Sequence, residues 1–323
     1  MIHLRAPAKL NLYLRVVGKR PDGYHEIETL FERIDLADEL TFEAQPDGLT
    51  LTCTEPTLSC GDDNLILKAA RLLQAASGTS RGARIHLVKH IPIAAGLGGG
   101  SSDAATTLGG LNTLWGLSLD RPRLMQLAAQ LGSDVPFFLS GTPFAVGRGR
   151  GERCEPLADS PPLAHVLVVP SERLSTSEVY AGAQIGLTAS KPSITMVEHA
   201  LRNGSLGELA HGLWNDLEPE AIRRCPVIAT LQASLRECGC LGTLVSGSGS
   251  AVFGLCADSA HAQGVAARLP AALESSVRRT AQAGMRMGAA GSWRIEIIQT
   301  DHQALPVTPN EVARCGDADE SSA

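Results

Sequence analysis

The sequence predicts a two-lobed protein that mixes strands and helices. Its 323 residues exceed the length at which a single hydrophobic core usually keeps growing. Segments with the two-residue period of strands alternate with segments of helical period through both halves of the chain. The stretch Asp159-Ser-Pro-Pro162 interrupts this pattern, and a fresh apolar run follows it from Ala164 to Val169. We therefore expect an N-terminal lobe over residues 1–160 and a second lobe over residues 161–302.

Composition narrows the classes of function. The formal net charge is −6, which argues against a general binder of nucleic acid or of membrane surfaces. No apolar run approaches the length of a bilayer, and the first segment lacks the apolar region of a secretory signal. The eight cysteines are scattered without a Cys-x-x-Cys pair, which favours buried thiols in a reducing compartment. We expect a soluble cytoplasmic protein, and the sequence specifies no oligomeric state.

The first expected strand, residues 3–17, has two different faces. Leucines at positions 10, 12 and 14 share one face, and the other face carries Lys9, Asn11, Tyr13 and Arg15. A solvated outer face explains the polar side chains without any function. The alternative is that Lys9 and Asn11 project together into a cleft. Both interpretations remain open at this stage.

A turn at Pro21-Asp22-Gly23 leads into the next expected strand, residues 27–36. Tyr24 and His25 open that strand, and on their own they are best explained by packing or surface exposure. Two short strands are expected at residues 39–44 and 49–53. A helix is expected from a cap at residues 62–64 through Ala76, closed by Ser77-Gly78.

The most informative stretch runs from Pro92 to Asp103. It follows an alternating strand at residues 85–91 and precedes a helical pattern at residues 104–114, for which Ser101 or Ser102 is the expected N-cap. Four glycines in five positions, 96–100, let backbone N–H groups converge beside the positive end of a helix. The stretch lacks the Gly-Lys-Ser/Thr ending of a P-loop and does not match Gly-x-Gly-x-x-Gly. It indicates a phosphate or nucleotide site, with a plain glycine-serine connector as the alternative.

Lys89, just before this loop, is in phase with the apolar side chains of its strand. It must either bind a partner such as a nucleotide phosphate or extend its ammonium to an edge. After a second helix at residues 122–131 comes Gly132-Ser133-Asp134. Asp134 is either the cap of a short helical turn or a buried carboxylate aimed at a substrate hydroxyl. Strands at residues 144–146 and 153–157 flank a basic turn, residues 147–151, expected to be a solvated loop.

The second half is expected to alternate helices and strands. Helices are predicted near residues 176–183, 193–202, 226–237 and 259–269, and strands at 242–246, 252–256 and 293–298. The loop Ser246-Gly-Ser-Gly-Ser250 suits either a tight hairpin or close approach to an anion. From Gln303 the chain turns polar and acidic, so residues 303–323 are expected to be disordered.

Several of these stretches match one superfamily. Pro92-x-x-x-Gly96-Leu-Gly98, followed by Ser101-Ser102, resembles the ATP loop shared by galactokinase, homoserine kinase, mevalonate kinase and phosphomevalonate kinase. Within it, Pro7-Ala8-Lys9-Leu10-Asn11-Leu12, Asp22-Gly23-Tyr24-His25 and Gly132-Ser133-Asp134-Val135-Pro136 resemble the family of 4-diphosphocytidyl-2-C-methyl-D-erythritol kinases. The similarity runs from about Ala6 to Ile298, and the order of the four motifs makes it specific.

The resemblance implies an α+β, two-lobed small-molecule kinase fold. Its N-terminal lobe would be a mixed sheet plus helices, ribosomal S5 domain 2-like, and its C-terminal lobe a ferredoxin-like α/β unit, with ATP and substrate in the cleft between them. The implied reaction is ATP-dependent phosphorylation of the 2-hydroxyl of 4-diphosphocytidyl-2-C-methyl-D-erythritol, in the non-mevalonate (methylerythritol phosphate) isoprenoid pathway. The implied partner is thus a small-molecule substrate, with ATP and Mg²⁺ as cofactors and no nucleic acid or membrane.

The resemblance also assigns roles to residues. Asp134 matches the catalytic carboxylate and Lys9 its partner lysine, while Asn11 would orient the sugar-alcohol end. Tyr24 and His25 would hold cytosine, and Thr176 and Tyr180 match a threonine and an aromatic flanking cytidine, the latter a phenylalanine in some relatives. Binding of ATP is implied for Pro92, Ile93, Ala94, Ala95, Gly96, Leu97, Gly98, Gly99, Gly100, Ser101, Ser102 and Lys89.

One departure and two alternatives accompany this interpretation. Asp103 places a negative charge just after the loop, where it opposes a triphosphate unless it helps to hold the metal. The metal ligands are not specified, although Ser101 or Ser102 can offer a hydroxyl. The alternatives are another small-molecule kinase of the superfamily, disfavoured by Tyr24-His25, and a nucleotide-binding module without catalysis.

Overall fold

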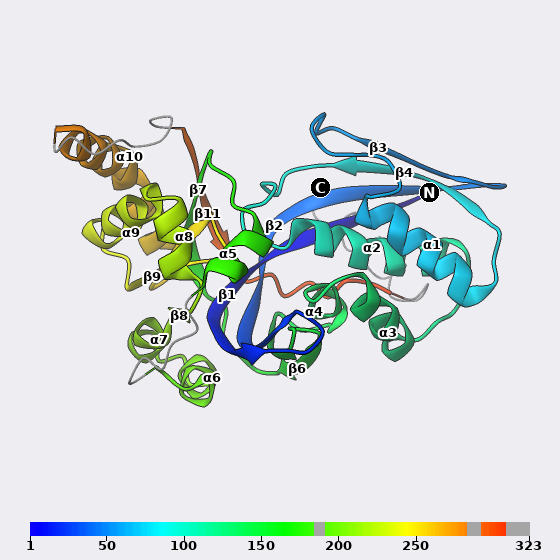
Figure 1. The fold of residues 1–323 in the computed structure, drawn as a ribbon, viewed down its shortest axis with the longest axis horizontal. Coiled ribbons are helices and arrows are strands. Elements are labelled where there is room, and N and C mark those ends of the chain that lie inside the picture. Colours follow the sequence, from blue (N-terminus) through cyan, green and yellow to red (C-terminus); the bar gives the residue numbers. More distant parts are fainter. Residues whose placement is uncertain (184–190, 283–291, 308–323) are drawn as a thin grey trace.

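The computed structural model describes residues 1–183, 191–282 and 292–307, which form two lobes side by side (Figure 1). One lobe contains the strands and helices up to Leu157. The other contains the strands and helices from Ala164 onward, apart from a two-residue strand described below. The expected boundary falls between β6 (Arg153–Leu157) and β7 (Ala164–Pro170), the first strand of the second sheet.

The N-terminal sheet is built on β1 (Ile2–Lys19) and β2 (His25–Gln45), which pair antiparallel along most of their length. The expected strands at 27–36 and 39–44 are one strand, because register shifts opposite it, including one between Pro7 and Ala8, let it bend without breaking. Strands β4 (Gly82–Val88) and β5 (Phe144–Gly149) pair with its two ends. β3 (Leu49–Cys53) and β6 extend the sheet.

Helices α1 (Leu65–Ser77), α2 (Gly99–Leu114), α3 (Arg121–Leu131) and α4 (Val135–Leu139) pack on this sheet. The side chain of Asn64 caps α1 by accepting a bond from the N–H of Ile66, and Gly78 ends the helix with a φ of +69°. α2 is rich in small residues because it approaches the sheet closely. A Cβ at Gly110 would lie 2.7 Å from the ring of Phe42.

The second lobe is a four-stranded antiparallel sheet in the order β11-β7-β10-β9, from β9 (Gly242–Val245), β10 (Val252–Cys256) and β11 (Trp293–Gln299) with β7. Its path through α9 (Val227–Glu237) and α10 (Ser259–Gln282) is strand, helix, strand, strand, helix, strand. This is the ferredoxin-like arrangement, and the two-lobed α+β expectation is confirmed.

Smaller elements complete this lobe. α5 (Thr176–Gly182) and α6 (Ile194–Arg202) lie where helices were expected. Three short elements were not expected: α7 (Leu206–Gly212), α8 (Glu218–Arg224) and β8 (Trp214–Asn215). β8 pairs with β1 and so joins the N-terminal sheet. α10 continues past its expected end at Leu269, with Pro270 inside it.

The two lobes share a core and a buried polar cluster. One apolar cluster joins Leu10 and Leu97 of the first lobe to Leu167 and Phe253 of the second. Beside it, Nε2 of His165 lies 2.8 Å from a carboxylate oxygen of Glu32, whose other oxygen accepts from the Thr300 hydroxyl at 2.6 Å. These contacts fix how the lobes meet, and hence the shape of the cleft between them.

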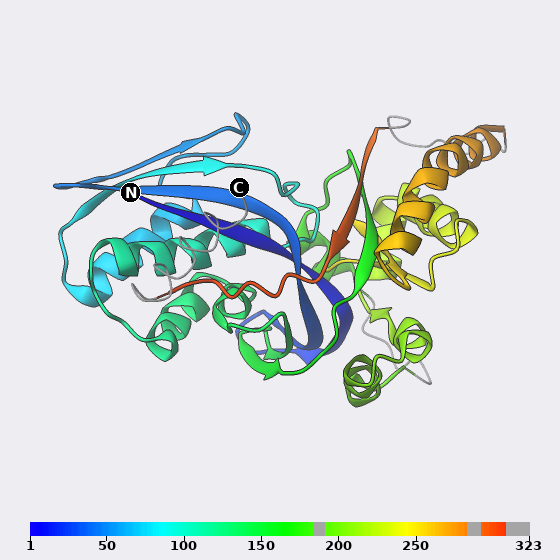
Figure 2. The same cartoon turned by 180° about the vertical axis from the view of Figure 1, so that it is seen from behind.

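The segment after β11 corrects one expectation. Residues 305–307 are packed rather than disordered, because Leu305 and Val307 are buried against the N-terminal lobe. The Asn112 side-chain amide donates to the carbonyl of Val307 at 2.8 Å. Figure 2 shows this segment, in red, running from β11 back along the helices of the first lobe. The rest of the expected tail, 308–323, lies outside the described residues. In the described part of the chain, every helix is too short or too polar to cross a membrane.

Candidate active site

The glycine loop, residues 92–100, is held by both lobes. The N–H of Lys9 donates to the carbonyl of Leu97 at 3.0 Å, and the N–H of Ala251 donates to that of Ala95 at 3.1 Å. Gly96 and Gly98 have φ of +80° and +70°. A Cβ at Gly96 would lie 2.0 Å from the carbonyl oxygen of Ser246. The loop therefore needs glycine for its conformation and for its contact with the second lobe.

The loop delivers the chain into α2 differently from the expectation. Gly98, not Ser101 or Ser102, is the N-cap, and it makes no side-chain capping bond. The two serines lie in the first turn, where Ser101 lines the cleft and Ser102 is buried. The first N–H groups of a helix have no partner within it, so this end of α2 suits an anion.

Lys9 and Asp134 lie next to each other in the wall of the cleft. The ammonium nitrogen of Lys9 lies 3.6 Å from Oδ2 of Asp134, and it donates to Oδ1 of Asn11 at 2.5 Å and to the carbonyl of Gly96 at 2.9 Å. Lys9 and Asn11 are both buried, so the solvated-face interpretation of this strand is wrong. Asp134 precedes α4 but makes no capping bond with its side chain, so the capping interpretation fails as well.

The environment of Lys9 shifts its proton affinity. Burial lowers the pKa of its ammonium, and the neighbouring Asp134 carboxylate opposes that shift. The amide of Asn11 donates to the hydroxyl of Thr29 at 2.8 Å, which fixes the amide's orientation. A lysine held by two acceptors, Asn11 and the carbonyl of Gly96, beside a partly exposed carboxylate is suited to activating an alcohol.

A cleft of about 870 Å³ joins the glycine loop to the aromatic residues. The rings of His25 and Tyr180 stack with centroids 5.2 Å apart, and the Thr176 hydroxyl lies 2.9 Å from that of Ser248. Burial, then the charge of Lys19, lowers the pKa of His25. Burial, then the charge of Asp134, raises the pKa of Tyr180. The Lys9–Asp134 pair therefore lies between the loop and the rings.

Every residue expected at the site lines this cleft except one. The cleft walls include Lys9, Asn11, Tyr24, His25, Lys89, residues 92–101, Asp134, Thr176 and Tyr180. Ser102 is the exception, since its side chain is buried beneath the loop and its hydroxyl has no hydrogen-bond partner.

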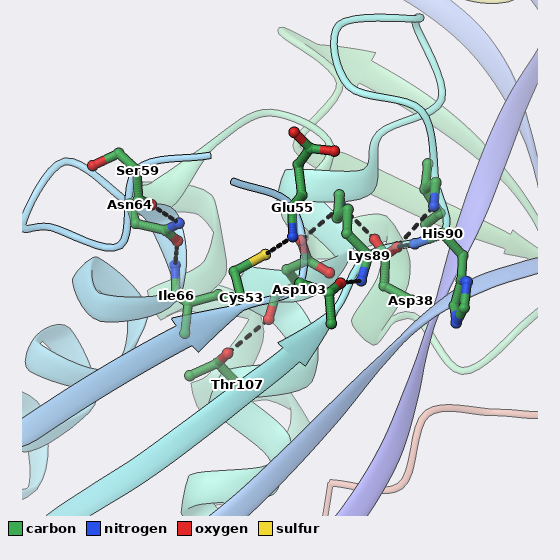
Figure 3. A network of polar contacts seen from close by, with 12 residues as sticks. Asp38, Cys53, Glu55, Ser59, Asn64, Ile66, Lys89, His90, Asp103 and Thr107 are labelled. Atoms are coloured by element: carbon green, nitrogen blue, oxygen red, sulfur yellow. Dashed lines mark hydrogen bonds and ion pairs between the residues drawn. The ribbon is translucent and has the colours of Figure 1, made fainter. Parts of the chain in front are cut away.

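Lys89 binds a partner rather than extending to an edge, and within the protein that partner is a pair of carboxylates. Its ammonium is buried between the carboxylates of Asp38 and Asp103, with the Asp103 oxygen at 2.9 Å (Figure 3). Asp38 also accepts from the backbone N–H groups of His90 and Ile91, at 2.6 and 2.8 Å. Burial, with the repulsion of Asp38, raises the pKa of Asp103 to about 7 against the pull of Lys89. The cluster of Asp38, Lys89 and Asp103 thus stabilises the backbone just before the glycine loop.

Gly247 and Ser248 line the cleft from the second lobe, in the loop for which the sequence left open either a tight hairpin or close approach to an anion. Sequence reasoning did not place Asn64 and Leu65, at the start of α1, in the cleft. Arg150 was expected in a solvated turn, yet its guanidinium lies over the ring of Tyr24, 4.6 Å from the centroid. The alternation of glycine and arginine around it was the available signal. In the described ranges, His, Cys, Asp and Glu form no group of three suited to a metal.

Comparison with known proteins identifies the family. Residues 64–142 match the model for the GHMP kinases N terminal domain, and residues 197–275 match that for GHMP kinases C terminal. A 4-diphosphocytidyl-2-C-methyl-D-erythritol kinase from Pelotomaculum thermopropionicum is 47% identical over 81% of this chain and 92% of its own length. A protein of the same name from Bordetella parapertussis is 46% identical over 77% of this chain and 80% of its own.

Comparison with solved structures leads to the same family. A crystal structure of 4-(cytidine 5'-diphospho)-2C-methyl-D-erythritol kinase superposes with a TM-score of 0.73 and 38% identity, over 93% of this chain and 100% of that one. The homoserine kinase of Cytophaga hutchinsonii, at 17% identity, shares the fold with a TM-score of 0.71 over 94% of this chain and 95% of its own. The chain therefore belongs to the 4-diphosphocytidyl-2-C-methyl-D-erythritol kinases, a family of the GHMP kinases.

Proposed function

We propose that the protein catalyses, in this cleft, transfer of the γ-phosphoryl group of ATP to the 2-hydroxyl of 4-diphosphocytidyl-2-C-methyl-D-erythritol. The products are the 2-phosphate and ADP, and the reaction belongs to the methylerythritol phosphate pathway of isoprenoid synthesis. The observation that carries this proposal is the Lys9–Asp134 pair, 3.6 Å apart in a cleft walled by the glycine loop. The enzyme acts as a small-molecule kinase of the cytoplasm.

Asp134 is the general base. It takes the proton of the substrate hydroxyl as that oxygen forms its bond to the γ-phosphorus and the bond from phosphorus to the ADP oxygen breaks. Lys9 stabilises the negative charge that develops on the attacking oxygen. Asn11, held by Thr29, orients the sugar-alcohol end of the substrate.

The two substrates approach from opposite ends. ATP binds with its phosphates on the N–H groups of residues 96–101 and its charge facing the start of α2. Tyr24 and His25 hold the cytosine by stacking and by hydrogen bonds to its edge, and Thr176 and Tyr180, whose ring stacks on His25, flank the cytidine. This arrangement directs the γ-phosphate toward the hydroxyl beside Asp134.

Oxygen donors at the start of α2 fit Mg²⁺. The Ser101 hydroxyl lines the cleft, and so does Asp103, whose Oδ1 is buried without a hydrogen-bond partner. These residues would hold the ion, which when bound neutralises phosphate charge.

The direct test is a coupled ADP-release assay with 4-diphosphocytidyl-2-C-methyl-D-erythritol, mevalonate and homoserine as separate acceptors. We expect turnover with the cytidyl substrate alone. Faster turnover with mevalonate or homoserine would reassign the acceptor within the superfamily. Binding of ATP without ADP release across the panel would leave a nucleotide-binding module.

A further inference from the structure

Arg150 lines the cleft but has no part in the proposed phosphoryl transfer. It lies in the turn between β5 and β6, and its guanidinium is stacked over the ring of Tyr24 at 4.6 Å. One of its terminal nitrogens donates to the carbonyl of Ala129 at 3.2 Å. The backbone N–H of Arg150 donates to the Glu152 carboxylate at 2.6 Å. One bond holds the backbone of Arg150 and the other holds its guanidinium, and the side chain between them lines the cleft.

The turn that carries Arg150 packs beside the catalytic carboxylate. Gly149 and Gly151 have φ of +76° and +114°, a backbone that only glycine adopts without strain. A Cβ at Gly151 would lie 3.6 Å from the ring of Phe31 and 3.7 Å from Cβ of Ser133, the neighbour of Asp134. Arg150 therefore lies between Tyr24, at one end of the acceptor site, and Ser133–Asp134 at the other.

The cleft carries more positive than negative charge, although the chain as a whole is negative. Its lining includes four cations, Lys9, Lys19, Lys89 and Arg150, against two carboxylates, Asp103 and Asp134. Lys9 faces Asp134 and Lys89 pairs with Asp103, so these two cations are balanced. Among the described residues no carboxylate forms an ion pair with Arg150, although Arg150 and the Asp22 carboxylate interact electrostatically at longer range. The guanidinium N–H groups that do not bond to Ala129 are therefore available to an anionic ligand.

The neighbouring arginine of the same turn behaves differently. Arg148 forms ion pairs with Glu155 at 2.6 Å and Glu28 at 3.9 Å, and it does not line the cleft. The two arginines therefore have different surroundings: Arg148 is paired with carboxylates outside the cleft, whereas Arg150 lines the cleft without an ion pair. Only the second has a geometry that suits substrate.

We propose that Arg150 binds the diphosphate of the nucleoside-diphosphate acceptor, with Tyr24 stacked beneath its guanidinium. The inference rests on the proposed function: with the base at Tyr24 and His25 and the reacting hydroxyl at Asp134, the diphosphate lies between them. A guanidinium stacked on an aromatic face keeps its N–H edge free for a bidentate bond to phosphate oxygens. Arg150 is therefore a binding residue for the acceptor and takes no part in proton transfer.

Arg150→Gln is the test variant and Arg148→Gln is the matched control. Calorimetry compares cytidine with cytidine 5'-diphosphate, and steady-state assays give KM for the acceptor and for ATP. In Arg150→Gln we expect affinity for the diphosphate to fall about tenfold or more while that for cytidine stays unchanged, since a bond to a charged group is lost. Acceptor KM rises by a similar factor, and the KM for ATP does not change. Arg148→Gln behaves as the wild type.

Three results would overturn the proposal. Equal loss of affinity for cytidine and for cytidine 5'-diphosphate would mean that Arg150 only supports the ring of Tyr24. An equal loss in Arg148→Gln would mean that net charge causes the effect, and no change in Arg150→Gln would mean that this side chain does not bind the diphosphate. Should Arg150→Gln melt at lower temperature, Arg150→Lys keeps the charge, and we expect diphosphate affinity between those of wild type and Arg150→Gln. The binding arms need no turnover. A wild type that shows the Arg150-dependent preference for the diphosphate but releases no ADP would therefore refute the proposed function alone.

Discussion

The ammonium of Lys9 contacts both halves of the site: its nitrogen lies 3.6 Å from Oδ2 of Asp134 and 2.9 Å from the carbonyl oxygen of Gly96. The first contact is to the carboxylate that faces the acceptor, and the second is to the loop proposed to hold ATP. One buried side chain of β1 thus sets the distance between donor loop and base. The pair depends on the fold of the whole N-terminal lobe, since its members are 125 positions apart (134 − 9).

Lys9→Met should lower kcat by about a hundredfold or more, because the developing negative charge loses its stabilising cation. Folding should survive, since burial already lowers the pKa of this ammonium and so disfavours its charge. Stopped assays and thermal melts on the same preparation measure both quantities. A variant that loses activity only in proportion to its loss of folded protein would reduce Lys9 to a packing residue.

Gly96→Ala should destabilise the loop and raise the KM for ATP. Its Cβ would lie 2.0 Å from the carbonyl oxygen of Ser246, and its φ of +80° is strained for alanine. We expect a loss of about 2 kcal/mol or more in the free energy of unfolding. Gly100→Ala is the matched control for stability, because its Cβ meets only the Leu65 side chain, at 3.7 Å. Equal stability of the two variants would contradict the close contact between the lobes.

His25 should titrate below the usual histidine range, since burial and the charge of Lys19 lower its pKa. The neutral ring then persists to lower pH, and the KM for the acceptor rises only as pH falls through that lowered value. Lys19→Met removes a repelling charge, so it should move the pKa of His25 upward. NMR titration of the imidazole C–H signal measures the shift directly. A pKa that stays in place or falls in Lys19→Met would show that Lys19 does not act on this ring.

Lys89→Met should be among the more destabilising substitutions in the chain, by about 3–5 kcal/mol, because it leaves the buried carboxylates of Asp38 and Asp103 facing each other. Adding Asp103→Asn removes one of those charges and should restore part of the loss. Urea denaturation of the two single variants and the double variant forms the cycle. Purely additive effects would mean that the three side chains are not coupled.

Asp103→Asn should change how stability depends on pH. The pKa of Asp103 is raised to about 7, so the folded state holds a proton that the unfolded state releases near pH 4. The contribution of this group to stability therefore declines as pH rises from about 4 to 7. The free energy of unfolding of Asp103→Asn, relative to wild type, should increase between about pH 4 and pH 7. A decrease over that interval would show that the charged form is the one favoured by folding.

Local patterns predicted the parts of the structure that local chemistry determines. The caps of α1 and the glycines of the loop act through their own backbone and nearest neighbours. Asn64, Gly78 and Gly96 could therefore be recognised from the sequence alone. The alternation along β1 placed Lys9 and Asn11 on one face. That this face is covered was not evident, since covering it requires the glycine loop and α4.

Contacts between distant segments could not be predicted in the same way. Asp38 binds Lys89 from a strand 51 positions earlier, and nothing in either neighbourhood indicates the other. The polar composition after Gln303 concealed Leu305 and Val307, which are ordered because the first lobe buries them. Arg150 enters the cleft because two glycines bend its turn over Phe31 and Ser133. The ring of Tyr24 then receives its guanidinium.

The most direct measurement is single-turnover phosphoryl transfer by Asp134→Asn, with ATP and acceptor both saturating. The account predicts a rate about 10²–10⁴-fold below wild type, with ATP and acceptor affinities retained, because the amide cannot take the hydroxyl proton. A transfer rate equal to that of the wild type would contradict it, since the substrate alcohol would then react without help from this carboxylate.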